Sequence, residues 1–296
     1  WTSYWTSPGS RYFNPAGVGS YFDAGAGAGG AIVPIYTYTL DDANRATITG
    51  YSGNATALYI PGEIDGHEVV AIGDRAFENR TDLRTVMIPD SVTRINIGAF
   101  SGCINLANIT LSKKIEKIGE NAFYNCDSLQ SVEIPKCLND VYARYDSIDI
   151  PNGVFNECSN LKTIIFEEGS TVIADALFRG CDGLESVTIP NTVTQIYGYA
   201  FADCKNLKNI NISDSVTVLE ENVFQNDTSI TEINLPDSIT ALGRGAFSGC
   251  NRLKSIVIPD SVINIGISAF SECKNLESVT LSKGLEKIGE NAFYNC

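Results

Sequence analysis

The chain has 296 residues, of which 44% are hydrophobic, with a net charge of −14 and a pI near 4.5. No apolar run approaches the roughly 18 residues that a membrane-spanning helix needs, so we expect no direct insertion into a membrane. An acidic surface repels phosphate backbones and anionic lipids, which excludes nucleic acid as a partner; solubility alone would also explain this acidity.

Residues 1–35 differ in composition from the rest, because Gly, Ala, Ser and aromatic residues dominate them. Such a segment is typical of a flexible leader or linker. Its many aromatic residues leave a second interpretation open, self-association of residues 1–30 with a neighbouring molecule. A G-x-G-x-x-G pattern at 25–30 lacks the following helix that dinucleotide binding requires, so no cofactor is expected. The chain starts at Trp1 without a signal sequence, and we expect any such sequence to be removed or to lie outside the chain.

Residues 36–77 form an atypical first unit that we expect to cap the N-terminal end of a repeat array. His67 is the only histidine of the chain and stands beside Gly66 in a turn. One histidine cannot build a Ser-His-Asp triad, a Cys-His pair or a multi-histidine zinc site. The sequence therefore predicts a structural role for His67.

From residue 77 onward one aromatic position recurs with a fixed period. The phenylalanines are Phe77, Phe100, Phe123, Phe155, Phe178, Phe201, Phe224, Phe247, Phe270 and Phe293. Eight of the nine intervals are 23 residues and one is 32. A cysteine follows three places later at Cys103, Cys126, Cys158, Cys181, Cys204, Cys250, Cys273 and Cys296, whereas Arg80 and Asp227 interrupt this column. The period predicts stacked coils of one structural unit over residues 78–296.

Each unit can be read as a short strand, a turn and a return. Ile256 and Ile258 alternate with polar or exposed positions, which is the pattern of a half-buried strand. Pro259 then starts a turn, and Val262 and Ile265 re-enter the interior from the opposite wall. One unit cannot bury this apolar edge by itself, so stacking on both neighbours must bury it.

The run Ile-Pro-Asp-Ser-Val-Thr-x-Ile-Gly-x-x-Ala-Phe-x-x-Cys-x-x-Leu resembles the BspA-type leucine-rich repeat of bacterial and protist surface proteins, and residues 36–77 resemble the first unit of such proteins. The resemblance implies an α/β-type repeat solenoid, mostly β with short turns or 3₁₀ segments, in a right-handed curved array of period 23. It also implies an extracellular or cell-surface location and a role in adhesion to host matrix, other microbes or glycans. These functional expectations rest on analogy, because a fold does not determine a function.

The irregular interval places an insertion near residues 136–150. It concentrates Tyr142, Arg144, Tyr145 and Asp146, residue types that are enriched at binding hot spots. Insertions in repeat arrays often emerge on the binding face, so these residues are candidates for contact with a partner. A tolerated surface loop without a partner is the alternative.

The eight periodic cysteines predict an internal thiol column. Equivalent positions on stacked strands lie about 4.8 Å apart with parallel side chains, whereas disulfides need Cβ atoms at about 3.8 Å that converge. Cys137 stands outside the column, and both a free thiol and a pairing stay open for it. Metal binding would need close pairs such as C-x-x-C, which the sequence lacks, so no metal is expected.

The outward positions of the predicted strands can be read from the alternation. They are Thr85/Met87, Asn108/Thr110, Ser131/Glu133, Thr163/Ile165, Ser186/Thr188, Asn209/Asn211, Glu232/Asn234, Ser255/Val257 and Ser278/Thr280. Among them, the candidates for partner binding are Glu133, Ile165, Asn209, Asn211, Glu232 and Asn234. Small hydroxyl and amide groups dominate, which fits a solvated sheet or a weak, multivalent binding surface.

The leading hypothesis is a non-enzymatic extracellular or cell-surface adhesion module that binds a protein or glycan partner. A rigid spacer or filament subunit is the alternative, and a binding module attached to a catalytic domain elsewhere is the third. A pair of carboxylates for glycoside hydrolysis is not favoured, because acids such as Asp237 and Asp260 follow proline in turns where Asp is preferred for backbone reasons. The chain stops at Cys296 inside a unit, so we expect further coils or another module to follow.

Overall fold

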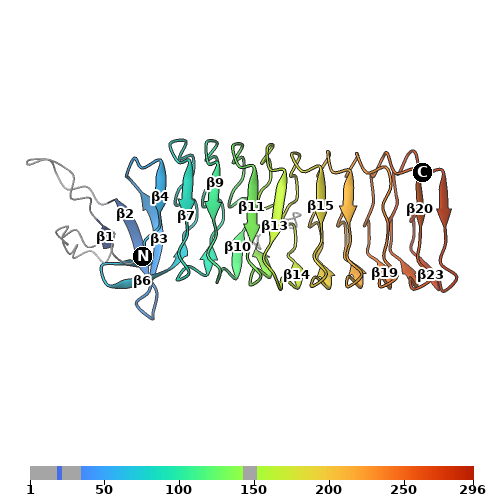
Figure 1. Cartoon of the computed structure of the whole chain (residues 1–296), viewed down its shortest axis with the longest axis horizontal. Coiled ribbons are helices and arrows are strands. Elements are labelled where there is room, and N and C mark those ends of the chain that lie inside the picture. The colour runs from blue at the N-terminus through green and yellow to red at the C-terminus, as the bar shows by residue number, and fades with distance from the viewer. Residues whose placement is uncertain (1–18, 22–34, 143–151) are drawn as a thin grey trace, which may run out of the picture.

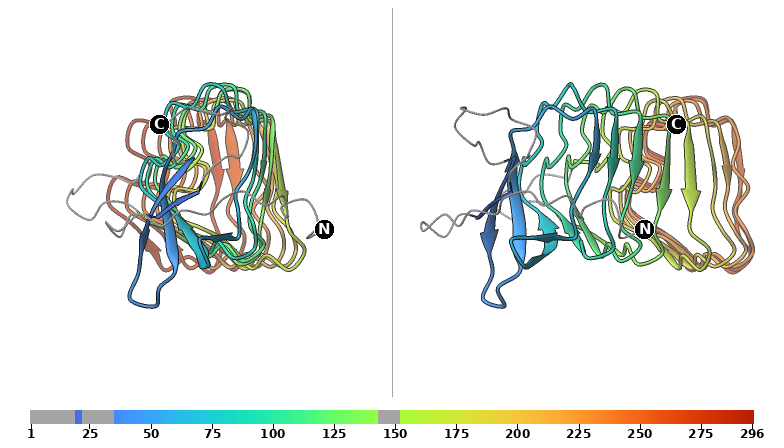
Figure 2. Two further views of the ribbon diagram at one scale, coloured as in Figure 1. Left: turned by 90° about the vertical axis from the view of Figure 1, so that its left-hand side faces the viewer. Right: turned by 60° about the vertical axis from the view of Figure 1, so that its left-hand side comes forward.

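The computed structural model describes residues 19–21, 35–142 and 152–296. These residues form an elongated stack of coils that runs from the N-terminal β-hairpin to the C-terminus (Figure 1). Viewed along the long axis, successive coils lie over one another, so equivalent residues form columns through the molecule (Figure 2). The predicted leucine-rich-repeat solenoid is confirmed.

One side of the stack, which we call the strand face, carries one short strand from nearly every coil. Its strands are β4 (Ala57–Tyr59), β7 (Thr85–Met87), β9 (Asn108–Thr110), β11 (Ser131–Ile134), β13 (Thr163–Phe166), β15 (Ser186–Thr188), β17 (Asn209–Asn211), β20 (Ser255–Val257) and β22 (Ser278–Thr280). Neighbours that pair are parallel, with Ser186 opposite Asn209 and Ser255 opposite Ser278. The 23-residue offset of these two pairs is the period of the sequence.

A second row of parallel strands, which the sequence did not predict, lines another side of the coils; we call it the second sheet, although the insertion divides it into two sheets. It contains β6 (His67–Ile72), β8 (Arg94–Ile95), β10 (Lys117–Gly119) and β12 (Asp140–Tyr142), and after the insertion β14 (Val172–Ile173), β16 (Gln195–Ile196), β18 (Val218–Leu219), β19 (Ala241–Leu242), β21 (Asn264–Ile265) and β23 (Lys287–Ile288). The isoleucine expected to enter the core from the opposite wall lies in these strands, as Ile265 does at 1% exposure.

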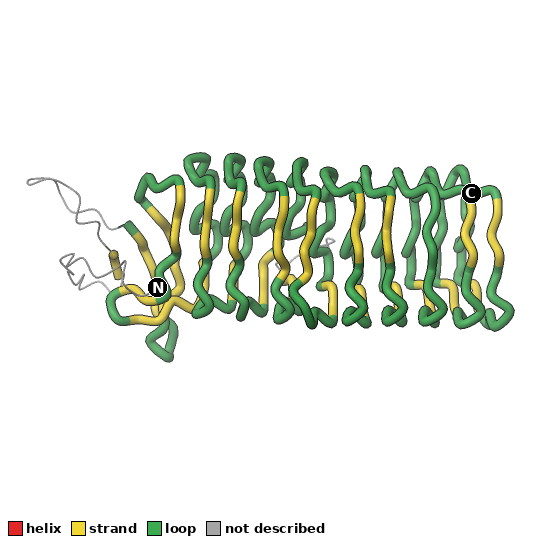
Figure 3. The backbone as a smooth tube through the Cα atoms, in the orientation of Figure 1, coloured by secondary structure: helices red, strands yellow, loops and turns green. Residues whose placement is uncertain are grey.

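The rest of each coil consists of turns, and the part of the chain that the structure describes contains no helix (Figure 3). Two backbone positions explain this. The residue two places after each phenylalanine adopts positive φ, and so does the residue two places before it except in the coil of Phe155, as Asn222 (54°) and Asn226 (60°) show around Phe224. Asn, Asp and Gly tolerate this conformation best, and a left-handed residue ends a right-handed helix.

The phenylalanines form one continuous stack through the core. From Phe77 to Phe293 the ring centroids of neighbours lie 4.9–6.0 Å apart, with interplanar angles of 3–19°. The backbone follows the same column, because the amide of Phe100 donates to the carbonyl of Ala122 in the next coil (2.7 Å). The stacked rings and these backbone hydrogen bonds therefore connect the coils where they consist of turns. Strand pairing connects them on the other sides.

Glycine at the end of the second-sheet strand permits close approach of the coils. A Cβ on Gly266 would lie 2.5 Å from the carbonyl carbon of Gly243 in the preceding coil. The Ile-Gly pair of the repeat is thus explained by contact between backbones.

The N-terminal unit closes the stack with antiparallel strands. β2 (Tyr36–Leu40) pairs with β3 (Ala46–Tyr51), β3 lies parallel to β6, and β5 (Glu63–Ile64) forms a short hairpin with β6. β1 (Gly19–Tyr21) pairs with β2 of its own chain. Tyr51 continues the aromatic stack, with its ring centroid 5.9 Å from that of Phe77.

Arg80 occupies the first position of the cysteine column and ties this unit to the repeats. Its guanidinium donates to the carbonyl oxygens of Tyr51 (2.8 Å) and Gly53 and pairs with Asp82. The guanidinium carbon also lies 4.8 Å from the centre of the Tyr51 ring. A long cationic side chain thus replaces the thiol where the neighbouring unit is irregular.

The insertion starts later than the sequence suggested. Leu138 (2% exposed) and Val141 (9%) are buried at repeat positions, and Val141 stands opposite Ile118 in the pairing of β10 with β12. Because the regular coil continues to Tyr142, the nine extra residues follow it. Most of them lie outside the described residues.

Candidate binding surface

The strand face exposes the positions that the alternation predicted. Of the eighteen outward residues, seventeen are exposed and Thr85 is half-buried. The residues between them, such as Val187 (5%) and Ile256 (2%), face the core. The exposure of Glu133, Ile165, Asn209, Asn211, Glu232 and Asn234 is confirmed, whereas their role in binding stays a prediction.

A shallow depression of about 310 Å³ lies on this face over three successive coils. Its rim is polar, with Ser186, Thr188, Lys208, Asn209, Asn211, Glu232 and Asn234 around the backbone of the strands. Four of the sequence-predicted candidates therefore meet at one place. The depression offers hydroxyl, amide, carboxylate and ammonium groups within one area.

The coil that contributes Glu232 and Asn234 is irregular. Residues 231–235 form no strand, although the equivalent residues of the adjacent coils form β17 and β20. The only backbone hydrogen bond that the structure gives this segment on the strand face joins the amide of Lys254 to the carbonyl of Thr231 (3.3 Å). Periodicity could not reveal this irregularity, because Ile230 and Ile233 keep the repeat pattern.

Glu133 and Ile165 lie apart from this depression. Glu133 in β11 lines a smaller hollow of about 80 Å³ with Lys113 and Glu167. Ile165 is 52% exposed in β13 beside it. Of the insertion candidates, Tyr142 lies in β12, and Arg144, Tyr145 and Asp146 lie outside the described residues.

The predicted internal thiol column is confirmed. Seven of the eight periodic cysteines are buried, Cys296 is exposed in the last coil, and all are free thiols. Burial raises the pKa of the Cys103 and Cys273 thiols to about 12, so these groups stay protonated. Cys137, outside the column, is free and exposed.

Each thiol has a partner that the sequence did not reveal. Sγ of Cys250 donates to the carbonyl oxygen of Phe224 in the preceding coil (3.2 Å), and Sγ of Cys273 donates to that of Phe247 (3.1 Å). The cysteines thus satisfy buried carbonyl groups between coils, which would cost free energy if left unpaired.

An asparagine column runs parallel to the cysteines and was also missed. Where the repeat reads Cys-x-Asn-Leu, the asparagine Nδ2 donates to a carbonyl of the preceding coil, as Asn206 does to Asp182 (2.8 Å) and Asn105 to Thr81 (2.7 Å). Turn aspartates bridge coils as well. Oδ1 of Asp260 accepts the amide of Lys283 (3.0 Å), so this Asp bonds to the next coil and not to its own turn as expected.

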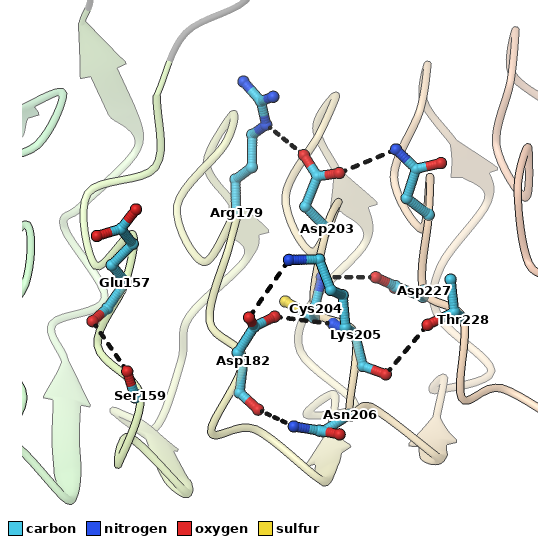
Figure 4. Close-up of polar contacts among 11 residues, drawn as sticks. Glu157, Ser159, Arg179, Asp182, Asp203, Cys204, Lys205, Asn206, Asp227 and Thr228 are labelled. Atoms are coloured by element: carbon cyan, nitrogen blue, oxygen red, sulfur yellow. Dashed lines mark hydrogen bonds and ion pairs between the residues drawn. The ribbon is translucent and has the colours of Figure 1, made fainter.

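The turn edge beside the cysteines carries an acidic cluster (Figure 4). Its carboxylates already have partners, because Asp203 pairs with Arg179 (3.0 Å) and Asp182 with Lys205 (3.4 Å). Within the described ranges, no group of three or more His, Cys, Asp or Glu side chains has the arrangement of a metal site. This cluster holds coils together.

One partly buried carboxyl has a raised pKa. Burial and the nearby Glu221 raise the pKa of Asp175 to about 6. His67, the only histidine, donates from Nδ1 to the carbonyl of Asn44 (2.9 Å), which agrees with its predicted structural role.

Comparison with known proteins identifies the family. The model of the BspA-type leucine-rich-repeat region matches residues 70–145, 148–262 and 241–296, which is most of the chain. The chain belongs to the BspA-type leucine-rich-repeat family. The predicted resemblance is confirmed, and proteins of this family are generally surface-associated or binding modules.

Solved structures share the solenoid of this BspA-type chain. A leucine-rich-repeat protein of T. pallidum is 29% identical, with a TM-score of 0.52, and the match covers 74% of this chain and 88% of that protein. The pneumococcal vaccine antigen PcpA is 17% identical, with a TM-score of 0.58, over 86% of this chain and 75% of that one; this likeness concerns the fold alone. A search of curated proteins gives no match.

The family is a repeat scaffold that is typically non-enzymatic. Among the residues that the structure describes, no helix has the length and apolarity to cross a membrane.

Proposed function

We propose that this BspA-type array is a non-enzymatic adhesion module, outside the cell or on its surface, that binds a protein or glycan partner through the strand face. The observation that carries the proposal is the polar depression at Asn209, Asn211, Glu232 and Asn234. Its groups are exposed, and the pairing of β15 with β17 holds Asn209 and Asn211 at fixed spacing. Preorganised polar groups lose little entropy on binding, which favours recognition of an extended hydrogen-bonding ligand.

Weak contacts repeated along the array would add up. The outward residues lack the Trp, Tyr and Arg anchors of a tight protein hot spot, except for Tyr59 (52% exposed) near the N-terminal unit. We therefore expect low affinity for a single site and a large gain from display of many copies.

The test compares binding of surface-immobilised chain to an array of matrix proteins and an array of glycans. The variant Asn209→Arg/Glu232→Arg changes size and charge at the depression while leaving the buried residues in place. Thr217→Arg is the matched control, because Thr217 is exposed before β18 on the second sheet. Binding that the depression variant loses and the control keeps supports the proposal. The two arrays separate a protein partner from a glycan, and absence of binding in both contradicts adhesion by this chain.

The insertion is tested separately with Arg144→Ala/Tyr145→Ala. Replacement of the whole stretch 136–146 would remove the buried Leu138 and Val141 and disturb the core. If Arg144→Ala/Tyr145→Ala loses ligand binding and the depression variant keeps it, the insertion and not the depression contacts the ligand.

A rigid spacer or filament subunit is the second candidate, favoured by the unbroken phenylalanine stack from Phe77 to Phe293. Self-association through residues 1–30 is its proposed mechanism, and apart from Gly19–Tyr21 that segment lies outside the described residues. Light scattering at several concentrations tests it. A chain that stays monomeric throughout contradicts assembly.

A further inference from the structure

Asp227 stands where the repeat has cysteine, and it is fully buried at 0% exposure. An ionised carboxylate at this depth is costly unless a cation or several donors compensate it. The structure gives Asp227 no ion pair within the described part of the chain. The question is how this coil tolerates an acid in the core.

The carboxyl has one partner and one free oxygen. Oδ1 accepts the backbone amide of Cys204 at 2.8 Å (Figure 4), and the buried Oδ2 has no hydrogen-bond partner. The titratable groups around it are Asp203 and Asp182, both acidic, and the thiols of Cys204 and Cys250 in the coils on either side. The nearby cations belong to other carboxylates, since Arg179 pairs with Asp203 and Lys205 with Asp182.

The repeat shows what lies opposite this position. Each donor cysteine bonds to a phenylalanine carbonyl 26 residues earlier, or 35 across the insertion. The accepting residues are Phe77, Phe100, Phe123, Phe155, Phe178, Phe224, Phe247 and Phe270. Phe201, which is 26 residues before Asp227, is missing from this series, and the other phenylalanine outside it is Phe293 of the last coil. Within the described residues, the Phe201 carbonyl therefore lacks the side-chain donor that its equivalents have.

We propose that Asp227 is held as a neutral carboxylic acid whose O–H on Oδ2 donates to the carbonyl of Phe201, in place of a thiol, and that its ionisation loosens this coil. A protonated carboxyl supplies one donor and keeps an acceptor. Oδ1 accepts the hydrogen bond of the Cys204 amide, and the O–H on Oδ2 takes the place of the thiol donor in the cysteine column. One proton on Oδ2 of Asp227 thus gives this oxygen a hydrogen-bond partner and gives the Phe201 carbonyl its side-chain donor.

The acidity of the group follows from the same surroundings. Burial raises the pKa of Asp227 well above its usual range, and Asp203 and Asp182 raise it further, against the lowering effect of the Cys204 amide. A folded-state pKa above the unfolded value means that stability is full at low pH and is lost as pH rises. Above about pH 4 the unfolded carboxyl ionises while the folded one stays protonated, so opening releases a proton.

This titration acts on the coil whose segment on the strand face forms no strand. Asp227 precedes residues 231–235, the segment without strand pairing, which carries Glu232 and Asn234 of the depression. If the proposed function holds, rising pH therefore loosens one wall of the binding surface. The proton switch itself does not depend on any ligand.

Native-state hydrogen exchange of the full chain tests the switch without a ligand, so its failure is distinct from failure of the adhesion proposal. Protection factors of the hydrogen-bonded amides in residues 224–230 are measured between about pH 5 and about pH 8. The opening constant of this coil should rise up to about tenfold per pH unit, until the folded acid itself ionises. In Asp227→Asn, which keeps a donor and an acceptor but does not titrate, the opening constant should be flat. Asp227→Cys restores the thiol of the repeat, and its opening constant should also stay flat over this pH range.

Asp237→Asn, an exposed turn carboxyl of the same coil, is the matched control and should retain the wild-type slope. An infrared carboxylic-acid carbonyl band at about pH 7 that Asp227→Asn removes would identify the proton directly. Equal slopes in wild type and Asp227→Asn, or the absence of that band, would overturn the proposal.

Discussion

Replacement of one ring in the phenylalanine stack tests whether neighbouring coils stabilise each other. Phe247 is fully buried and stacks on Phe224 (5.6 Å) and Phe270 (5.3 Å). Deletion of a buried Phe side chain costs about 3–5 kcal/mol, so Phe247→Ala should lower the free energy of unfolding by that amount. Phe247→Leu keeps most of the volume but loses two ring pairs, worth together roughly 1–3 kcal/mol.

Phe293 is the matched comparison, because it is only partly buried and, among the described residues, stacks on Phe270 alone. In a nearest-neighbour array, a residue with one interface contributes about half as much as a residue with two. Urea denaturation gives the total cost, and hydrogen exchange locates it. Equal costs for Phe247→Ala and Phe293→Ala, or exchange that rises evenly along the chain, would refute the nearest-neighbour reasoning.

Three further predictions concern single groups. A thiol reagent should label Cys137 of the native protein rapidly and Cys103 only on unfolding, because Cys103 is buried and its pKa is raised to about 12; mass spectrometry of the labelled peptides checks this. Arg80→Ala removes a charged donor from the Tyr51 carbonyl and should destabilise the N-terminal unit by about 1.5–3 kcal/mol, seen as faster exchange in residues 46–51, whereas unchanged exchange there would show that the bond is dispensable. The folded-state pKa of Asp175 is raised to about 6, so its contribution to stability is present below about pH 4 and lost as pH rises through 6. Asp175→Asn should therefore flatten the dependence of the urea midpoint on pH. A variant whose midpoint shifts by the same amount at every pH would contradict this.

The fold could be predicted because one large residue recurs at constant spacing. Phe must be buried, and burial at an interval of 23 residues permits only a stack of equivalent coils. The same equivalence predicted free thiols, since Cys250 and Cys273 take corresponding places in neighbouring coils. What Sγ bonds to could not be predicted, because its partner is a backbone carbonyl of another coil. A repeat pattern shows which residue recurs but not which atom of the neighbouring coil its side chain contacts.

The candidate surface was predictable for a similar reason and to a similar extent. Alternation along each strand decides exposure, so Asn209 and Glu232 could be placed outward from the sequence. The depression they share also includes residues of the segment 231–235, whose loss of strand pairing the intact apolar pattern did not reveal. Asp227 was visible as a break in the cysteine column. Its meaning required the position of its carboxyl oxygens relative to the Cys204 amide.

The side-chain bonds between coils have a consequence for how such a chain can change in length. Each coil that carries the periodic cysteine gives a thiol donor to the coil before it, as Cys250 does to Phe224, and four coils add an asparagine donor, as Asn206 does to Asp182. Every junction that has the cysteine therefore has the same thiol donor and the same phenylalanine carbonyl as acceptor. Duplication or loss of 23 residues, cut at any point of the repeat, joins two halves that already fit. Residues 111–126 and 281–296 are nearly the same sequence, as expected if whole coils have been copied. The coil of Asp227 is the exception, because copying it would place a second acid in the core.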